Sequence, residues 1–130
     1  MTLTGTLADG LEVAVTAKRT DAGLEVTLGA EPSDLTRAHD LRFEAELTDY
    51  LAAAERGEHA ERAFPDTGAE TLMRGLELRH ADGRMAPHSV TGAFGGSETP
   101  WRVVFRSPDW QPAEVLIVGE GIALHVPVEG

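Results

Sequence analysis

Apolar and polar residues alternate with a period of two along most of the chain. Between residues 11 and 18, for example, Leu11, Val13, Val15 and Ala17 take every second position. Such alternation is typical of half-buried β-strands. The sequence therefore predicts eight or nine short strands, within the segments 3–7, 11–18, 24–28, 41–47, 76–80, 90–94, 101–106, 115–118 and 122–126.

Turns that contain glycine separate several of these segments, at Asp9-Gly10, Asp21-Ala22-Gly23 and Asp82-Gly83. Asp-Gly and related pairs favour tight reversals between neighbouring strands. We therefore expect the first three strands to form a meander. The segment 29–40 contains Pro32-Ser33-Asp34 and is expected to be a loop that precedes the strand at 41–47.

The hydrophobic period changes after residue 47. Leu47, Tyr50, Leu51 and Ala54 recur at the spacing of one helical face. We expect one broken helix or two short ones over residues 49–63, with Tyr50, Leu51, Ala54 and Phe64 buried on one side. This is the one helical signal that the pattern gives, and it lies between strands.

These elements predict one domain over residues 1–130. A chain of 130 residues is long enough to bury a core without a metal or a disulfide. Short strands separated by turns at regular spacing are typical of antiparallel sandwiches and barrels. The predicted fold is mostly β: a single antiparallel β-sandwich of eight or nine strands, with a short helical insert near residues 49–63.

The charge of the chain excludes several classes of partner. Eleven basic and 22 acidic residues give a formal net charge of −11 at pH 7. A nucleic-acid-binding surface needs a basic footprint, and an anionic membrane also attracts basic segments. We therefore expect no nucleic-acid partner. We also expect no membrane insertion, because no run of 18 apolar residues occurs.

The residue usage bears on compartment. The absence of cysteine excludes a disulfide scaffold, a thiol redox site and a cysteine nucleophile. The first residues show neither the basic nor the apolar region of a secretory signal. The sequence as given predicts a cytoplasmic protein, and an exported or envelope location would require that a leader had been removed. Ten arginines beside Lys18 alone, with no asparagine, indicate a GC-rich bacterial genome.

Three potential metal ligands flank the Asp82-Gly83 turn. His80, Asp82 and His88 are residue types that bind zinc or copper, but their spacing matches no known local signature. In the alternative interpretation Asp82 stabilises its own turn and the histidines are ordinary strand residues. The sequence favours this alternative, so we expect no metal and no cofactor.

No catalytic motif emerges from the remaining polar residues. Ser89 or Ser97 could join a histidine and an aspartate in a triad, but neither lies in a nucleophile elbow. Glu44 and Glu46 would share one face of the predicted strand. They could act as a pair of catalytic carboxylates, but a solvent-exposed face of the sheet is the better interpretation. We therefore expect a protein that is not an enzyme.

The second half of the chain carries a pattern of turn glycines and alternating strands. Its members are Ala81-Asp82-Gly83-Arg84, Ser89, Gly92, Phe94, Trp101-Arg102-Val103-Val104-Phe105, Pro112-Ala113-Glu114-Val115-Leu116-Ile117 and Leu124-His125-Val126-Pro127. Residues 76–127 thereby resemble the closing strands of immunoglobulin-like accessory domains of bacterial exported and envelope proteins. The resemblance implies a binding or structural module without catalytic residues. The helical insert and the missing signal peptide depart from that family.

Two functional hypotheses follow. The first is a non-enzymatic bacterial module for protein binding or structural support. The alternative is a small acidic inhibitor of the immunity-protein kind, which covers the basic site of a toxin or nuclease. Since function often lies on irregular segments carried by a rigid scaffold, the candidate partner-binding residues lie in the insert and in one loop. They are Glu55, Glu58, His59, Glu61, Arg62 and Trp110.

Overall fold

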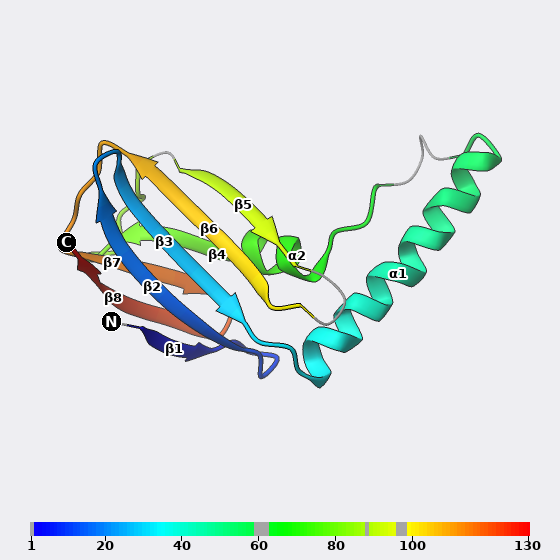
Figure 1. Ribbon diagram of the computed structural model, residues 1–130, viewed down its shortest axis with the longest axis horizontal. Coiled ribbons are helices and arrows are strands. Elements are labelled where there is room, and N and C mark those ends of the chain that lie inside the picture. The colour runs from blue at the N-terminus through cyan, green and yellow to red at the C-terminus, as the bar shows by residue number, and fades with distance from the viewer. Residues whose placement is uncertain (1, 59–62, 88, 96–98) are drawn as a thin grey trace.

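The computed structural model describes residues 2–58, 63–87, 89–95 and 99–130. Figure 1 shows a curled β-sheet from which one long helix projects. The elements follow the order β1 (Leu3–Thr6), β2 (Glu12–Thr20), β3 (Gly23–Ala30), α1 (Asp34–Glu55), α2 (Gly68–Arg74), β4 (Leu76–His80), β5 (Val90–Phe94), β6 (Trp101–Pro108), β7 (Glu114–Gly119) and β8 (Ile122–Glu129). The mostly β character predicted from the sequence is confirmed.

Within the described residues, the eight strands form one mixed sheet in the order β4-β7-β8-β2-β3-β6-β5, with β1 also paired to β2. The predicted meander of the first three strands is confirmed, because β1, β2 and β3 pair antiparallel in turn. The purely antiparallel prediction is wrong at one junction, where β2 and β8 run parallel. The sheet curls into a half-barrel (Figure 1), and an immunoglobulin-type sandwich is not confirmed.

The core fills the concave side of this curled sheet. Alternate residues of β2 are buried, and Val13, Val15 and Ala17 are fully inaccessible to solvent. They join one apolar cluster with side chains of the other strands and with Ala69 and Leu72 of α2. Helix α2 contacts both edge strands, β4 and β5, as well as β6. This short helix therefore closes the open side of the half-barrel.

The helix prediction is wrong in its position. The structure places a single helix over residues 34–55, where the sequence pattern predicted a loop, a strand at 41–47 and a helix from 49. Ser33 caps this helix: its Oγ accepts from the Thr36 N–H at 3.3 Å, and the Ser33 N–H donates to Thr36 Oγ1 at 2.8 Å. No glycine or proline interrupts the segment that follows, and Leu, Ala, Glu and Arg favour a helix there.

Helix α2 was not predicted, although the sequence holds a local signal for it. Thr67 and Glu70 form a capping box, in which the Glu70 N–H donates to Thr67 Oγ1 and Glu70 Oε1 accepts from the Thr67 N–H. Ser or Thr followed three residues later by Glu is the known signature of such a start. The helix begins with Gly68, which lies directly against the indole of Trp101.

We predict that Gly68→Ala lowers the free energy of unfolding by about 1–3 kcal/mol. A Cβ at this position would overlap the ring of Trp101, which is 2% exposed and has little room to move. Urea unfolding measures the loss.

The matched control for this prediction is Gly75→Ala at the other end of α2. There the backbone has an ordinary φ of −82°, and an added Cβ would lie 3.5 Å from the Thr71 carbonyl oxygen. This variant should retain the parental stability or exceed it. Equal stability of the two variants would contradict the close packing of Gly68 on Trp101.

Candidate functional site

Of the three potential metal ligands, the structure describes His80 and Asp82, and each contacts another residue. The His80 ring packs edge-on against Trp110, with 4.8 Å between the ring centroids. Asp82 instead stabilises its own turn, since Oδ1 accepts from the Arg84 N–H at 3.0 Å and Oδ2 lies 2.6 Å from Arg84 Nε. The Arg84 backbone N–H and guanidinium hold the pKa of the Asp82 carboxyl below its usual value. His88 lies outside the described residues.

The other polar candidates are also dispersed. The Ser89 hydroxyl donates to the Pro87 carbonyl oxygen at 3.4 Å, and Ser97 lies outside the described residues. Glu44 and Glu46 lie on α1, not on a strand. Residues two positions apart on a helix point in different directions. The prediction that Glu44 and Glu46 share one face is therefore wrong. Among the described residues, no group of three His, Asp or Glu side chains could hold a metal ion.

The predicted partner-binding residues that the structure describes, Glu55, Glu58 and Trp110, lie in two separate places. Glu55 is the last residue of α1, and Glu58 follows it with an ion pair to Arg56 at 3.0 Å. His59, Glu61 and Arg62 lie outside the described residues. The expected burial of the insert is wrong for Leu51 and Phe64, which are 53% and 60% exposed.

Trp110 lies at the opposite end of the sheet from the helix. Strand β3 pairs with β6 from Gly23 opposite Pro108 to Ala30 opposite Trp101. Trp110 follows the Pro108 end, whereas α1 follows the Ala30 end, as Figure 1 shows. Trp110 is half-buried against the core, and its loop is fixed by the Gln111 side chain, which donates to the Thr20 carbonyl oxygen at 2.9 Å. Trp110 and the helix therefore do not form one continuous surface.

The structure identifies a more prominent feature, which we call the arm: helix α1 from Phe43 to Glu55, together with Phe64 beside it. The arm stands away from the half-barrel (Figure 1). Its base is anchored one turn earlier, where Trp101 Nε1–H donates to Asp40 Oδ1 at 3.2 Å. His39 packs edge-on against the same indole, with 5.6 Å between centroids.

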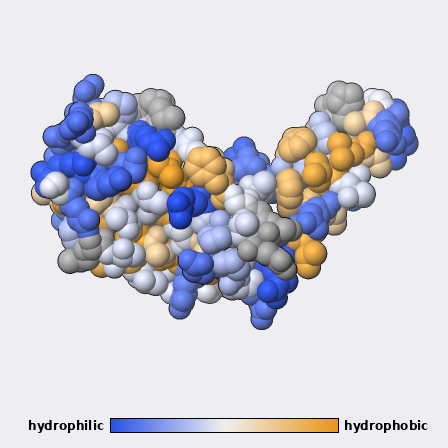
Figure 2. Space-filling view, in the orientation of Figure 1, coloured by the Kyte–Doolittle hydropathy of each residue, from blue (hydrophilic) through white to orange (hydrophobic). Residues whose placement is uncertain are grey.

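One face of the arm is apolar. Its side chains, which we call the arm stripe, follow one another at helical spacing and are Phe43, Leu47, Tyr50, Leu51 and Ala54. Phe64 returns alongside and packs edge-on against Tyr50 at 5.0 Å between centroids. Leu51 and Phe64 are exposed, whereas the other four side chains of the stripe are half-buried, so this face is partly open to solvent. In Figure 2 apolar side chains gather on the arm, apart from those of the sheet.

Acidic residues surround the stripe. Between residues 42 and 58 the helix and its C-terminal turn carry Glu44, Glu46, Asp49, Glu55 and Glu58, against Arg42 and Arg56. The basic side chains of this stretch are thus outnumbered, and Arg56 is already paired with Glu58. The arm combines a partly exposed apolar stripe with an acidic border.

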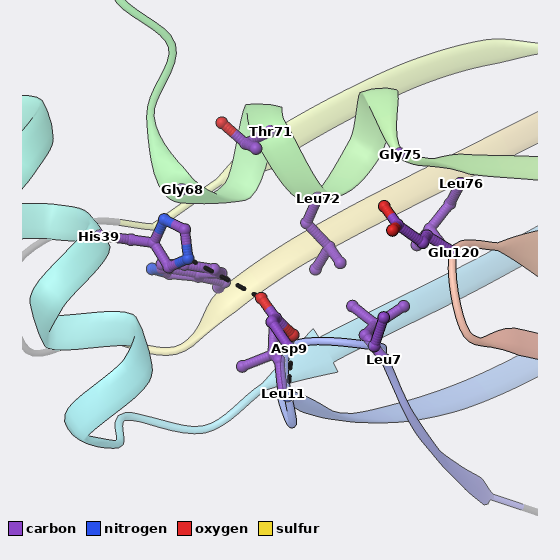
Figure 3. A pocket seen from close by; sticks show the side chains of 12 residues that line it. Leu7, Asp9, Leu11, His39, Gly68, Thr71, Leu72, Gly75, Leu76 and Glu120 are labelled. Carbon is purple, nitrogen blue, oxygen red and sulfur yellow. Dashed lines mark hydrogen bonds and ion pairs between the residues drawn. The ribbon is translucent and has the colours of Figure 1, made fainter.

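A cavity of about 420 Å³ lies at the base of the arm (Figure 3). It is bounded by the β1–β2 turn, His39 of α1, one face of α2, and the β7–β8 turn, with Trp101 in its wall. Sequence analysis missed this cavity, because its walls come from segments that are far apart in the chain.

Comparison of the chain with protein-family models, with curated proteins and with solved structures finds no match. None of the helices in the described part of the chain combines the length and the apolar character that crossing a bilayer requires.

We predict that Trp110→Ala lowers the free energy of unfolding by about 2–3 kcal/mol, because it removes a large side chain that packs on the core and on His80. Chemical denaturation measures this change, and Trp110→Phe should recover most of it. A Trp110→Ala protein of parental stability would show that this side chain has no structural role. That result would favour the alternative that Trp110 binds a partner.

Proposed function

We propose that the chain is a non-enzymatic protein-binding module and that the arm is its binding element. The observation that carries the proposal is the partly exposed arm stripe on a helix that projects from the half-barrel. Helix α1 has 22 residues, so it is about 33 Å long, and its contacts with the half-barrel are at its first turns. The outer turns keep an apolar face that is partly open to solvent.

The spacing of the stripe matches one mode of recognition. Helices that bind in a groove use apolar residues at i, i+3, i+4 and i+7 as anchors. Leu47, Tyr50, Leu51 and Ala54 follow this spacing. Because acidic residues border the stripe, the partner that fits best is a protein with an apolar groove and a basic rim.

The proposal also includes the kinship suggested by the sequence, with immunoglobulin-like accessory domains of bacterial exported and envelope proteins. This part of the proposal rests on the sequence pattern of residues 76–127. In such a setting the half-barrel would be the structural support and the arm the part that contacts the partner.

A second candidate function uses the same surface. An acidic inhibitor of the immunity-protein kind would place the arm against the basic site of a toxin or nuclease. The observation that favours it is the acidic border of the arm, together with the net charge of −11. Such charge accelerates association with a basic partner and makes it depend on salt.

We predict that Leu47→Glu abolishes capture of the partner from a lysate of the source organism, because it places a carboxylate within the apolar contact. The control is Ala45→Glu, which adds the same charge two residues away. That position lies about 200° around the helix from Leu47 and is exposed. The captured protein, identified by mass spectrometry, should be present with the parent and with Ala45→Glu.

Two results would contradict this prediction. One is equal capture by both variants. The other is a parental protein that light scattering shows to be a dimer and that Leu47→Glu converts to a monomer, since the stripe would then be covered by a second copy of the chain.

We further predict that Glu55→Lys combined with Glu58→Lys weakens capture most at low salt. The pair changes the charge of the arm border by four units and leaves the stripe intact, and the field of such charges is screened within about 10 Å at 0.1 M salt. Binding is measured at several salt concentrations. A defect that is the same at every salt concentration would show that these side chains act by contact and would contradict electrostatic steering.

A further inference from the structure

The cavity at the base of the arm is a defined space that the proposed protein-binding function does not use. Its volume of about 420 Å³ falls in the range of small-molecule sites in proteins. Leu7, Leu11, Leu72 and Leu76 give it apolar walls, and Trp101 contributes to the same lining. Figure 3 shows these leucine side chains around the space between the β1–β2 turn and α2.

Two glycines of α2 keep this space open. Gly68 and Gly75 both line the cavity and add no side chain to it. Gly68 is required by its contact with Trp101, whereas Gly75 has an ordinary backbone conformation and only van der Waals neighbours. An added Cβ at Gly75 would therefore make only van der Waals contacts, at a position that lines the cavity.

The opposite wall is made by two turns that are joined directly. The Ala8 N–H donates to the Glu120 carbonyl oxygen at 3.1 Å, so the β1–β2 and β7–β8 turns are neighbours. At Gly121, where φ is +81°, an added Cβ would lie 2.6 Å from the Ala8 nitrogen, which shows how closely the turns approach. This junction brings the side chains of Asp9 and Glu120 to the same cavity.

The polar groups of the cavity are mainly acidic. Asp9 and Glu120 are carboxylates, and neither lysine nor arginine occurs among the described residues that line the space. Asp9 Oδ1 accepts from the Leu11 N–H at 3.0 Å, and Oδ2 lies 3.9 Å from His39 Nε2. The Thr71 hydroxyl donates to the Thr67 carbonyl oxygen and is thereby engaged within its own helix.

From this geometry we propose that the cavity binds a small organic cation: a primary ammonium group attached to an apolar alkyl or aryl body. The leucines and Trp101 take the apolar body, and the carboxylates of Asp9 and Glu120 take the ammonium group. A carboxylate or phosphate ligand is disfavoured, because it would meet two like charges and neither lysine nor arginine lines the cavity. The net charge of −11 strengthens the same preference, since a cleft in an acidic protein concentrates cations.

Three probes of similar shape test the chemical class: 2-phenylethylammonium, 2-phenylethanol and 3-phenylpropanoate. Binding to the full chain is measured by titration with NMR detection. We expect the ammonium probe to bind most tightly, the alcohol to bind more weakly and the carboxylate not to bind. Equal affinity for the ammonium and the alcohol would overturn the proposed role of the carboxylates. Absence of ammonium binding at millimolar concentration would overturn the site.

Variants locate the binding. Asp9→Asn removes one charge but keeps an oxygen that accepts from the Leu11 N–H. It should lower the affinity for the ammonium probe by up to about fivefold. The control is Asp21→Asn, which makes the same change in the turn between β2 and β3, at the end of the sheet remote from the cavity. Gly75→Leu should fold with parental stability and abolish binding by filling the space. Unchanged binding by a folded Gly75→Leu protein would refute this location.

The test is independent of the proposed protein-binding function. Leu47→Glu, which alters the arm stripe, should bind the ammonium probe with parental affinity, since Leu47 does not line the cavity. Loss of probe binding in Leu47→Glu would contradict the separation of the two sites.

Discussion

The hydrogen bond between the Trp101 indole and the Asp40 carboxylate joins parts of the chain that would otherwise have little contact. Trp101 is the first residue of β6, and Asp40 lies in the second turn of α1. Both side chains are buried, with 2% and 9% of their surface exposed. If either partner were removed, the other would remain as an unsatisfied buried polar group, which costs about 1–3 kcal/mol and more when the group is charged. Gly68 and His39 pack on the same indole, so the start of α2, the base of α1 and the cavity wall depend on one contact.

This anchor holds only the beginning of a long helix. Helix α1 as a whole has its Ser33 cap, good helix formers and a length of 22 residues, above the 12–15 residues at which isolated helices are marginal. Packing usually supplies most of the stability of a helix in a protein, and the outer turns lack it against the half-barrel. The exposed Leu51 and Phe64 therefore represent apolar surface whose burial against a partner would be favourable by about 25 cal/mol per Å². The outer turns are weakly packed because part of the apolar stripe has no contact with the half-barrel. The same uncovered surface makes the arm suitable for binding a partner.

The strands were predictable because their signals are local. Alternation on β2 and β3 and the Gly-containing turn between them appear within twenty residues. Helix α1 was missed because Leu41, Phe43, Ala45 and Leu47 alternate like a strand, although the Ser33 cap and the absence of later breakers favoured a helix. The capping box before α2 was equally visible. The Trp101–Asp40 contact joins residues 61 positions apart, and the cavity brings Asp9 to Glu120, so no local pattern could reveal either.

The arm stripe and the cavity use different residues of α1, and these residues lie at different positions along the helix axis. His39 lines the cavity and Asp40 holds Trp101, whereas Leu47 lies eight residues after His39, about 12 Å further along the axis. Substitutions that far apart, with no shared partner, usually act independently. Trp101 is the common element, because it forms part of the cavity wall and also fixes the base of the arm. A change at Trp101 should therefore affect both sites, whereas changes in the outer turns of α1 or on the Gly75 face of α2 affect one of them. The half-barrel serves both sites by fixing that single indole in place.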